Sequence, residues 1–269
     1  MTVLLGAVAY DPKVVTIWDG FRRWFREHGV ELDYVLYSNY EHQVEDLVAG
    51  RINVAWNSPL AWVRTRRLAP SARAVVMRDS DCDLTSVIVV RNDAPVSSVD
   101  DLAGLVVGTG AVDSPQATLI PLQLLSGVDA EVRPFNVGVG LHGDHIGGER
   151  DAAIALLAGT VDAACMIDGN HLLFSHEGVL PPGSTRVIAQ TPVYDHCNMS
   201  VVDADVEAFA DLLLGMDYGD ASVRPLLDLE GLKRWVPGRT SGYAQLERAV
   251  DATGFYDAKG AVTAAGYRP

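Results

Sequence analysis

The sequence is poor in lysine and contains no long apolar run. Lysine occurs three times in 269 residues, and 35 acidic against 21 basic residues give a formal charge of −14. Nucleic acids and anionic membrane surfaces are bound through clustered lysine and arginine, so we expect neither as a partner. No apolar run approaches the roughly 20 residues of a membrane span, so we do not expect membrane insertion.

Cysteine is also scarce. Cys82, Cys165 and Cys197 form no CxxC pair, which argues against a disulfide-rich fold and leaves only a weak signal for structural zinc. The first residues lack the basic segment and the long apolar segment of a secretory signal. We therefore predict reduced thiols and a cytoplasmic location.

Apolar runs alternate with amphipathic stretches through the first third of the chain. The expected strands span residues 3–9, 31–36, 53–56, 72–78 and 85–91. The helical patterns between them span residues 15–28, 40–49 and 59–67. This alternation of strand and helix predicts an α/β fold whose sheet contains parallel strands.

Two polar, linker-like segments divide the chain. Residues 92–98 precede a second series of strand and helix patterns, and residues 191–195 end it. The predicted lobes are residues 1–91 plus 196–269 and residues 92–195, with hinge crossings at 91–98 and 190–196. Ligands of such two-lobed α/β proteins bind between the lobes, at the C-terminal ends of strands.

One internal repeat supports this division. Residues 44–56 and 153–165 both read as the end of a helix, an Ala-Gly turn and a buried strand. The repeat either marks two similar lobes or reflects the general pattern of α/β units.

Three segments together resemble a known family. They read YDPKVVTIWDGF, SNYEHQVEDLVAGRINVAWNSPLAWV and VIVVRNDAPVSSVDDLAGLVVGTGAVDSPQATLIPLQLL. In order and spacing they resemble type 2 periplasmic-binding-protein-like chains, and most closely the phosphate and phosphonate substrate-binding branch. The resemblance implies a two-lobed Venus-flytrap fold with two hinge crossings. Such a fold closes on a small anionic or polar ligand that carries a phosphonate, phosphate or carboxylate group.

Two features depart from that branch. Its transport members carry export signals or lipoprotein cysteines, and Asp113 in the expected anion loop would repel an anion. The same fold also serves cytoplasmic enzymes, so the alternative is a lyase or decarboxylase that acts on a small carboxylated substrate. The sequence leaves enzymatic activity and oligomeric state open.

Predicted ligand contacts gather at loops that follow strands. Ser58 and Ser114 each precede a proline that opens a helix, and free amides at a helix N-terminus can hold a phosphate or carboxylate. Ordinary helix capping is the alternative for both serines. The residues predicted to contact the ligand are Tyr10, Tyr40, Ser58, Ser86, Ser114, Gln116, Thr118, His171 and Tyr194.

Histidines are concentrated in the second lobe and at its return hinge. If the protein is an enzyme, His142, His145 or His196 would act as acid or base, with Asp168 as an orienting group. These histidines could instead be polar loop residues. No cofactor is predicted, and a divalent metal near His142, Asp144 and His145 is only weakly indicated. A direct contact between His196 and Cys197 is disfavoured, because adjacent residues on a strand point to opposite faces.

Overall fold

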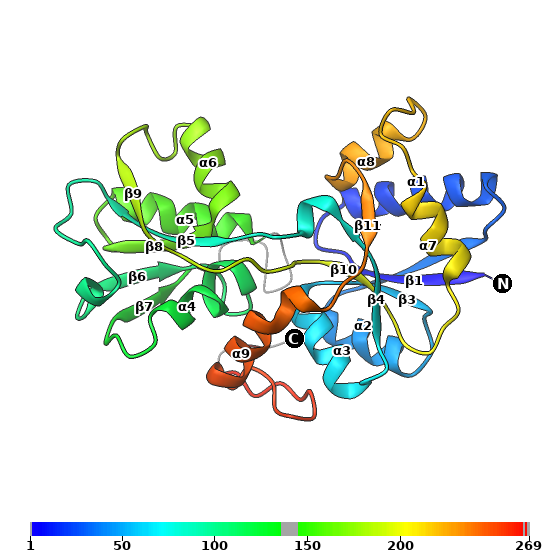
Figure 1. Cartoon of the computed structure of the whole chain (residues 1–269), viewed down its shortest axis with the longest axis horizontal. Coiled ribbons are helices and arrows are strands. Elements are labelled where there is room, and N and C mark those ends of the chain that lie inside the picture. The colour runs from blue at the N-terminus through cyan, green and yellow to red at the C-terminus, as the bar shows by residue number, and fades with distance from the viewer. Residues whose placement is uncertain (1, 136–144, 266, 268–269) are drawn as a thin grey trace.

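The computed structural model of the chain describes residues 2–135, 145–265 and 267, and it has two α/β lobes joined side by side (Figure 1). Each lobe contains one mixed sheet with helices packed on it. This arrangement confirms the predicted two-lobed α/β fold. No described helix has the length and apolar character needed to cross a membrane.

The first sheet has the strand order β11-β4-β10-β3-β1-β2. Its strands are β1 (Val3–Val8), β2 (Leu32–Tyr37), β3 (Val54–Asn57), β4 (Arg73–Arg78), β10 (Asn198–Val201) and β11 (Trp235–Pro237). Strands β1, β2 and β3 are parallel, whereas β10 pairs antiparallel with both β3 and β4. The chain therefore returns from the second lobe into the middle of the first sheet.

Helices cover the first sheet because their apolar residues recur at helical spacing. They are α1 (Lys13–Glu27), α2 (Tyr40–Val48), α3 (Pro59–Leu68), α7 (Glu207–Leu214) and α8 (Arg224–Glu230). In α1 the buried face consists of Val14, Ile17, Trp18, Phe21 and Phe25. These side chains join Trp56, Phe209 and Trp235 in the largest apolar cluster of the lobe.

The second sheet has the strand order β7-β6-β8-β5-β9. Its strands are β5 (Ser86–Arg91), β6 (Val106–Thr109), β7 (Glu131–Pro134), β8 (Ala163–Ile167) and β9 (Thr185–Gln190). The helical segments of this lobe are the π-helical turn η3 (Pro115–Leu119), α4 (Pro121–Leu124), α5 (Ile146–Leu157) and α6 (Asp168–His176), with a 3-10 turn η2 at Asp100–Leu102.

The first lobe boundary differs from the expected one. Residues 86–91, which we assigned to the first lobe, form strand β5 between β8 and β9 of the second sheet. The polar segment 92–98 is a loop that follows this strand, since the Asn92 amide donates to the Ser184 carbonyl of the same lobe. Polar composition marks a loop, but it does not distinguish a loop within a lobe from a crossing between lobes.

The two crossings lie side by side between the sheets. Residues 79–85, which begin with the turn η1 (Asp79–Asp81), lead from β4 to β5, and residues 191–197 lead from β9 to β10. Leu84 and Tyr194 exchange two backbone hydrogen bonds of 2.8 Å, and the His196 amide donates to the Asp81 carbonyl at 2.8 Å. The hinge is therefore a short antiparallel pair.

The C-terminal segment touches both lobes. After the turn η4 (Ser241–Tyr243), helix α9 (Ala244–Thr253) lies below the junction of the lobes in Figure 1. Leu246 and Phe255 share one apolar cluster with Leu60 of the first lobe and with Leu119 and Ile120 of the second. This segment therefore packs across the interlobe boundary.

The internal repeat has a structural counterpart. Gly50 ends the turn after α2 and Gly159 ends the turn after α5, and both have φ of +69°. That left-handed conformation favours glycine. The repeated sequence thus forms the same helix–turn–strand unit in each lobe.

Candidate ligand-binding site

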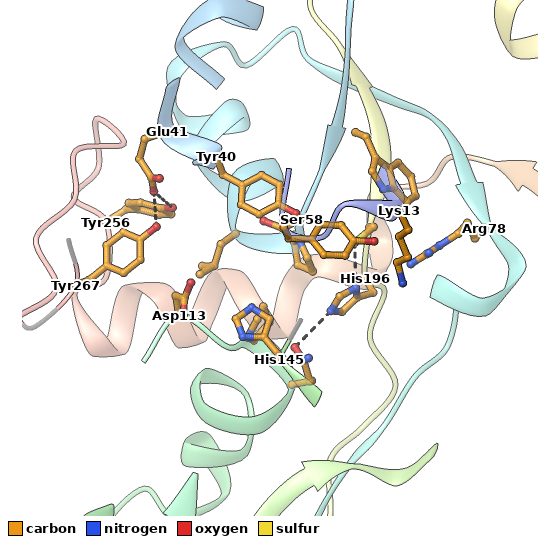
Figure 2. Close-up of a pocket in the computed structure, with 17 residues that line it drawn as sticks. Lys13, Tyr40, Glu41, Ser58, Arg78, Asp113, His145, His196, Tyr256 and Tyr267 are labelled. Atoms are coloured by element: carbon orange, nitrogen blue, oxygen red, sulfur yellow. Dashed lines mark hydrogen bonds between the residues drawn. The ribbon is translucent and has the colours of Figure 1, made fainter. Parts of the chain in front are cut away.

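A pocket of about 250 Å³ lies where the lobes, the hinge and the C-terminal segment meet (Figure 2). The first lobe lines it with Tyr10, Lys13, Tyr40, Glu41, Trp56, Ser58, Pro59, Leu60 and Arg78. The second lobe contributes Asp113, Pro115, Gln116 and His145, the hinge contributes His196 and Cys197, and the C-terminal segment contributes Tyr256 and Tyr267. The pocket therefore depends on all four parts of the chain.

Arg78 ends strand β4 and is fixed by buried acids. Its Nε donates to Asp81 Oδ2 at 2.5 Å, and its Nη2 donates to Asp81 Oδ1 at 3.0 Å. Its Nη1 donates to the Glu230 carbonyl at 2.8 Å, and its guanidinium lies 5.1 Å from the centre of the Trp56 ring. Burial opposes the charge on Asp81, but Arg78 and His196 lower its pKa to about 2. The pair is thus ionised at neutral pH.

His196 adds a second positive charge beside Arg78. Its Nδ1 lies 3.1 Å from Cys197 Sγ and 3.5 Å from Asp81 Oδ1, and its Nε2 lies 3.3 Å from Gln116 Oε1. Burial lowers the pKa of His196, but the neighbouring Cys197 and Asp81 outweigh this effect and raise it to about 10. His196 is therefore an imidazolium at neutral pH.

Lys13 completes this side of the pocket, which we call the cationic end (Lys13, Arg78 and His196). Lys13 is the first residue of α1, and its Nζ lies 5.7 Å from the centre of the Tyr10 ring. Ser58 lies nearby as the N-cap of α3, where its Oγ accepts from the Ala61 amide at 3.2 Å. This end combines positive charge with hydroxyl groups.

The opposite side, which we call the acidic end, contains Glu41, Asp113, Tyr256 and Tyr267 (Figure 2). Glu41 Oε1 accepts from the Tyr267 hydroxyl at 2.8 Å and from the Tyr256 hydroxyl at 3.3 Å. Burial, and secondarily the charge of Glu41, raise the pKa of Asp113 to about 7. The pocket thus has basic side chains at one end and buried carboxyl groups at the other.

Several sequence-predicted residues reach the pocket. Its lining includes Tyr10, Tyr40, Ser58 and Gln116 among the predicted ligand contacts, and His145 and His196 among the predicted catalytic residues. His142 and Asp144 lie outside the described residues, so the possible metal ligands His142, Asp144 and His145 are described only at His145.

The other residues predicted to contact the ligand form hydrogen bonds within the second lobe or to the hinge, and they are not part of this pocket lining. Ser86 Oγ donates to the Gln116 carbonyl at 2.5 Å and pairs with the Tyr194 hydroxyl at 2.7 Å. Ser114 Oγ caps η3 by accepting from the Ala117 amide at 3.1 Å, and Thr118 Oγ1 donates to the Ala111 carbonyl at 2.7 Å. The Ser114 side chain therefore caps the helical turn, as the capping alternative expected.

Asp168 and His171 also make contacts within the second lobe. Asp168 Oδ2 accepts from Thr85 Oγ1 at 2.7 Å, and His171 Nε2 lies 3.2 Å from Thr185 Oγ1. Both residues belong to α6, and neither is part of the pocket lining described above. Asp168 thus bonds to the hinge crossing at Thr85, and His171 to strand β9 at Thr185.

Sequence reasoning missed much of the pocket chemistry. The contact between His196 and Cys197 was judged unfavourable, but residues 195–197 precede β10 and are not a regular strand, so strict alternation does not apply. Arg78 could have been found as a charged residue at the end of a buried strand. No motif marks Tyr256 or Tyr267, which approach Glu41 only through tertiary packing.

The three donors Asp81, His196 and Cys197 lie close enough together to be compared with a metal site. One donor atom from each lies within 4.8 Å of the others. Both carboxylate oxygens of Asp81 already accept from Arg78, whose charge would repel a cation. These residues therefore suit an anion-binding surface better than a metal centre.

A family description matches most of the chain. The description "ABC transporter, phosphonate, periplasmic substrate-binding protein" covers residues 7–243. A probable ABC transporter phosphite-binding protein, PhnD1 of Prochlorococcus marinus strain MIT 9301, is 24% identical over 238 residues, which are 81% of this chain and 77% of that protein.

Solved structures share the fold at low sequence identity. PhnD1 of Prochlorococcus marinus in complex with methylphosphonate has a TM-score of 0.66 at 18% identity, covering 94% of this chain and 98% of that one. XAC2383 of Xanthomonas citri bound to ATP has a TM-score of 0.70 at 17% identity, covering 93% and 97%. The aliphatic sulphonate-binding protein SsuA of Escherichia coli has a TM-score of 0.55 at 15% identity, covering 100% and 94%.

Proposed function

We propose that the interlobe pocket of this chain binds a small phosphonate-type anion, because the chain belongs to the family of periplasmic substrate-binding proteins of phosphonate ABC transporters. The observation that supports this ligand is the cationic end. Arg78 and His196 are both protonated at neutral pH and both lie at the junction of the lobes. Charged donors of this kind form short, strong hydrogen bonds to phosphonate oxygens.

Family membership corrects the predicted location and favours the binding interpretation over the enzyme alternative. The cytoplasmic location that we expected from the first residues is wrong, because the family is periplasmic. The comparisons support the binding interpretation and not the lyase or decarboxylase alternative.

The local charge balance favours an anion at this end. Lys13, Arg78 and His196 are opposed by Asp81, by Cys197, which raises the pKa of His196 despite burial, and in part by Glu230, whose pKa burial raises to about 7 despite Arg78. Three basic side chains thus gather where the ligand would enter. A ligand held there contacts the first lobe through Arg78 and the second through Gln116, which links closure of the hinge to binding.

Calorimetric titration with methylphosphonate, phosphite, phosphate and ethanesulfonate tests the proposal. Lys13→Gln should weaken methylphosphonate binding about tenfold, equivalent to about 1.4 kcal/mol. Lys259→Gln removes the same charge from an exposed position in the C-terminal segment and should leave affinity unchanged. Binding of ethanesulfonate but not of methylphosphonate would assign the pocket to sulfonates instead, and no binding of any of the four would refute an anion site.

A further inference from the structure

Cys197 differs from the other two cysteines in its surroundings. It lines the interlobe pocket and is half-buried, so a small solute in the pocket can reach its sulfur. Cys165 is fully buried in an apolar cluster of the second lobe. Cys82 is half-buried, but it is not part of the described pocket lining. That lining therefore contains one of the three sulfurs.

The Cys197 sulfur lies beside positive charge. His196 Nδ1 is 3.1 Å from Sγ, and this imidazole is protonated at neutral pH. Arg78 also interacts electrostatically with Cys197. The Asp81 carboxylate, 3.5 Å from the same imidazole nitrogen, already accepts two hydrogen bonds from Arg78. Positive charge next to a cysteine favours the thiolate, which is the form that reacts as a nucleophile.

The surroundings of the other two cysteines have the opposite effect. Burial, with a smaller contribution from Asp195, raises the pKa of Cys82 to about 11, and burial raises the pKa of Cys165 to about 12. Both side chains therefore remain thiols at neutral pH, and the Cys82 Sγ donates to the Arg78 carbonyl at 3.5 Å. Because a protonated thiol is a poor nucleophile, these two cysteines are internal comparisons for Cys197.

We propose that Cys197 is an oxidation site inside the pocket, at which hydrogen peroxide converts the thiolate to a sulfenic acid. In this step the sulfur attacks one oxygen of the peroxide, so that an S–O bond forms and the O–O bond breaks. The sulfur is oxidised and the peroxide is reduced. The hydroxide that leaves takes a proton from His196 and becomes water. Susceptibility to this step follows thiolate character and exposure, and the surroundings of Cys197 favour both.

Oxidation at this position changes the cationic end. The new oxygen is bonded to a sulfur that lies 3.1 Å from His196 Nδ1, in a pocket of about 250 Å³. It therefore takes up space and competes for a hydrogen-bond donor on the side where the anion would lie. We expect oxidation to weaken anion binding and a bound anion to shield the sulfur. This effect on binding rests on the proposed function, whereas the oxidation itself does not.

Peroxide treatment with dimedone trapping tests this directly, since dimedone labels sulfenic acids and peptide mass spectrometry assigns the label to a residue. Labelling of Cys197 in the folded protein should proceed at least about tenfold faster than labelling of Cys82 or Cys165. Saturating methylphosphonate should slow the labelling of Cys197 at least about fivefold, because the ligand covers the sulfur. Alkylation by iodoacetamide, followed in the same way, should give the same order of the three cysteines.

Variants connect the label to ligand binding. Peroxide treatment should weaken methylphosphonate binding by wild type at least about tenfold, whereas Cys197→Ser should bind equally before and after treatment. Cys82→Ser keeps the pocket sulfur and is the matched control, so its binding should remain sensitive to peroxide. His196→Gln removes the imidazolium and should slow labelling of Cys197 at least about fivefold. If that variant fails to fold, the order of the three cysteines in wild type still tests the proposal.

The outcomes separate this inference from the proposed function. Labelling of Cys197 no faster than labelling of Cys82 would overturn the oxidation site and leave phosphonate binding intact. Fast labelling of Cys197 in a protein that binds none of the four anions would refute the proposed function and retain the oxidation site. Complete labelling with unchanged methylphosphonate affinity would overturn the expected effect on binding.

Discussion

The two ends of the pocket hold their charges in opposite ways. At the cationic end, Arg78 is paired on both sides by Asp81 and Glu230, so its position is set before any ligand arrives. At the acidic end, Glu41 and Asp113 each keep an unpartnered oxygen within the described structure. The first end is preorganised by the protein, whereas the second keeps buried acceptors that the described residues do not satisfy. Preorganisation lowers the cost of binding, and an unsatisfied group increases discrimination between ligands.

The largest expected effect comes from breaking the cationic end. Arg78→Ala should lower the free energy of unfolding by about 3–5 kcal/mol, because it leaves the buried Asp81 carboxylate without its main partner and with His196 at 3.5 Å as its remaining ion pair. It should also abolish detectable methylphosphonate binding. Urea denaturation and calorimetric titration measure the two effects.

Arg51→Ala is the matched control for this variant. Arg51 pairs with Asp46 at 2.5 Å, but its side chain is 60% exposed, so we expect a loss below about 1 kcal/mol. Equal losses for the two variants would contradict the view that the cationic end is a buried, preorganised ion pair.

The next effect concerns pH at the acidic end. The titratable groups that face Asp113 are Tyr40, Glu41, His145, Tyr256 and Tyr267. Burial raises the Asp113 pKa from 3.8 to about 7, so the folded protein holds a proton that the unfolded chain has released. Wild type should therefore lose stability relative to Asp113→Asn as pH rises from about 4 to 7.

The size of that loss follows from the shift in pKa. A shift of about three units corresponds to at most about 4 kcal/mol, and above pH 7 the difference should stay constant. Thermal unfolding of both proteins without ligand, at half-unit steps from pH 4.5 to 8, measures it. A difference that does not change with pH would mean that Asp113 titrates normally.

A smaller effect is expected from the tyrosine that supports Glu41. Tyr267→Phe removes the hydroxyl that donates to Glu41 Oε1 at 2.8 Å, which should cost about 1–2 kcal/mol of stability. Tyr256→Phe removes a longer contact of 3.3 Å and should cost less. Denaturation of the two variants side by side gives the order, and the reverse order would disprove this assignment of the main donor.

The smallest effect on ligand binding should come from the ion pair that joins the two hinge crossings. Arg239 Nη2 donates to Asp83 and Asp195 at 2.6 Å each and so joins the two crossings. Arg239→Ala should lower the free energy of unfolding by about 1–3 kcal/mol, because it leaves the buried Asp195 carboxylate with the Asp83 amide as its remaining hydrogen-bond donor among the described residues. We expect methylphosphonate affinity to fall about two- to fivefold, which calorimetric titration measures. A loss of affinity as large as that of Arg78→Ala would contradict a role for Arg239 in the hinge alone.

The fold could be predicted because its signals are local. The apolar periodicity of α1 and the alternation of strands and helices each depend on neighbouring residues, and both correspond to elements of the structure. The lobe boundary at residue 91 was wrong because strand β5 has the same apolar pattern in either sheet. Which sheet a buried strand joins is decided by long-range pairing.

The pocket could be predicted only in part, for a related reason. Ser58 was found because the sequence Asn-Ser-Pro after a strand identifies a cap at the end of a sheet. Ser86 and Thr118 are not in the pocket lining described above, and their hydroxyls donate to the backbone carbonyls of Gln116 and Ala111. Glu41 and Tyr267 are separated by 226 residues, and no sequence pattern records their contact.

The C-terminal segment affects how easily the two lobes can separate. Leu246 and Phe255 pack against Leu60 of one lobe and against Leu119 and Ile120 of the other. Rotation of the lobes away from each other would expose part of this apolar surface, at about 25 cal/mol per Å². Packing of this segment therefore opposes separation of the lobes. Because release of a bound ligand requires the lobes to separate, the segment should slow ligand release.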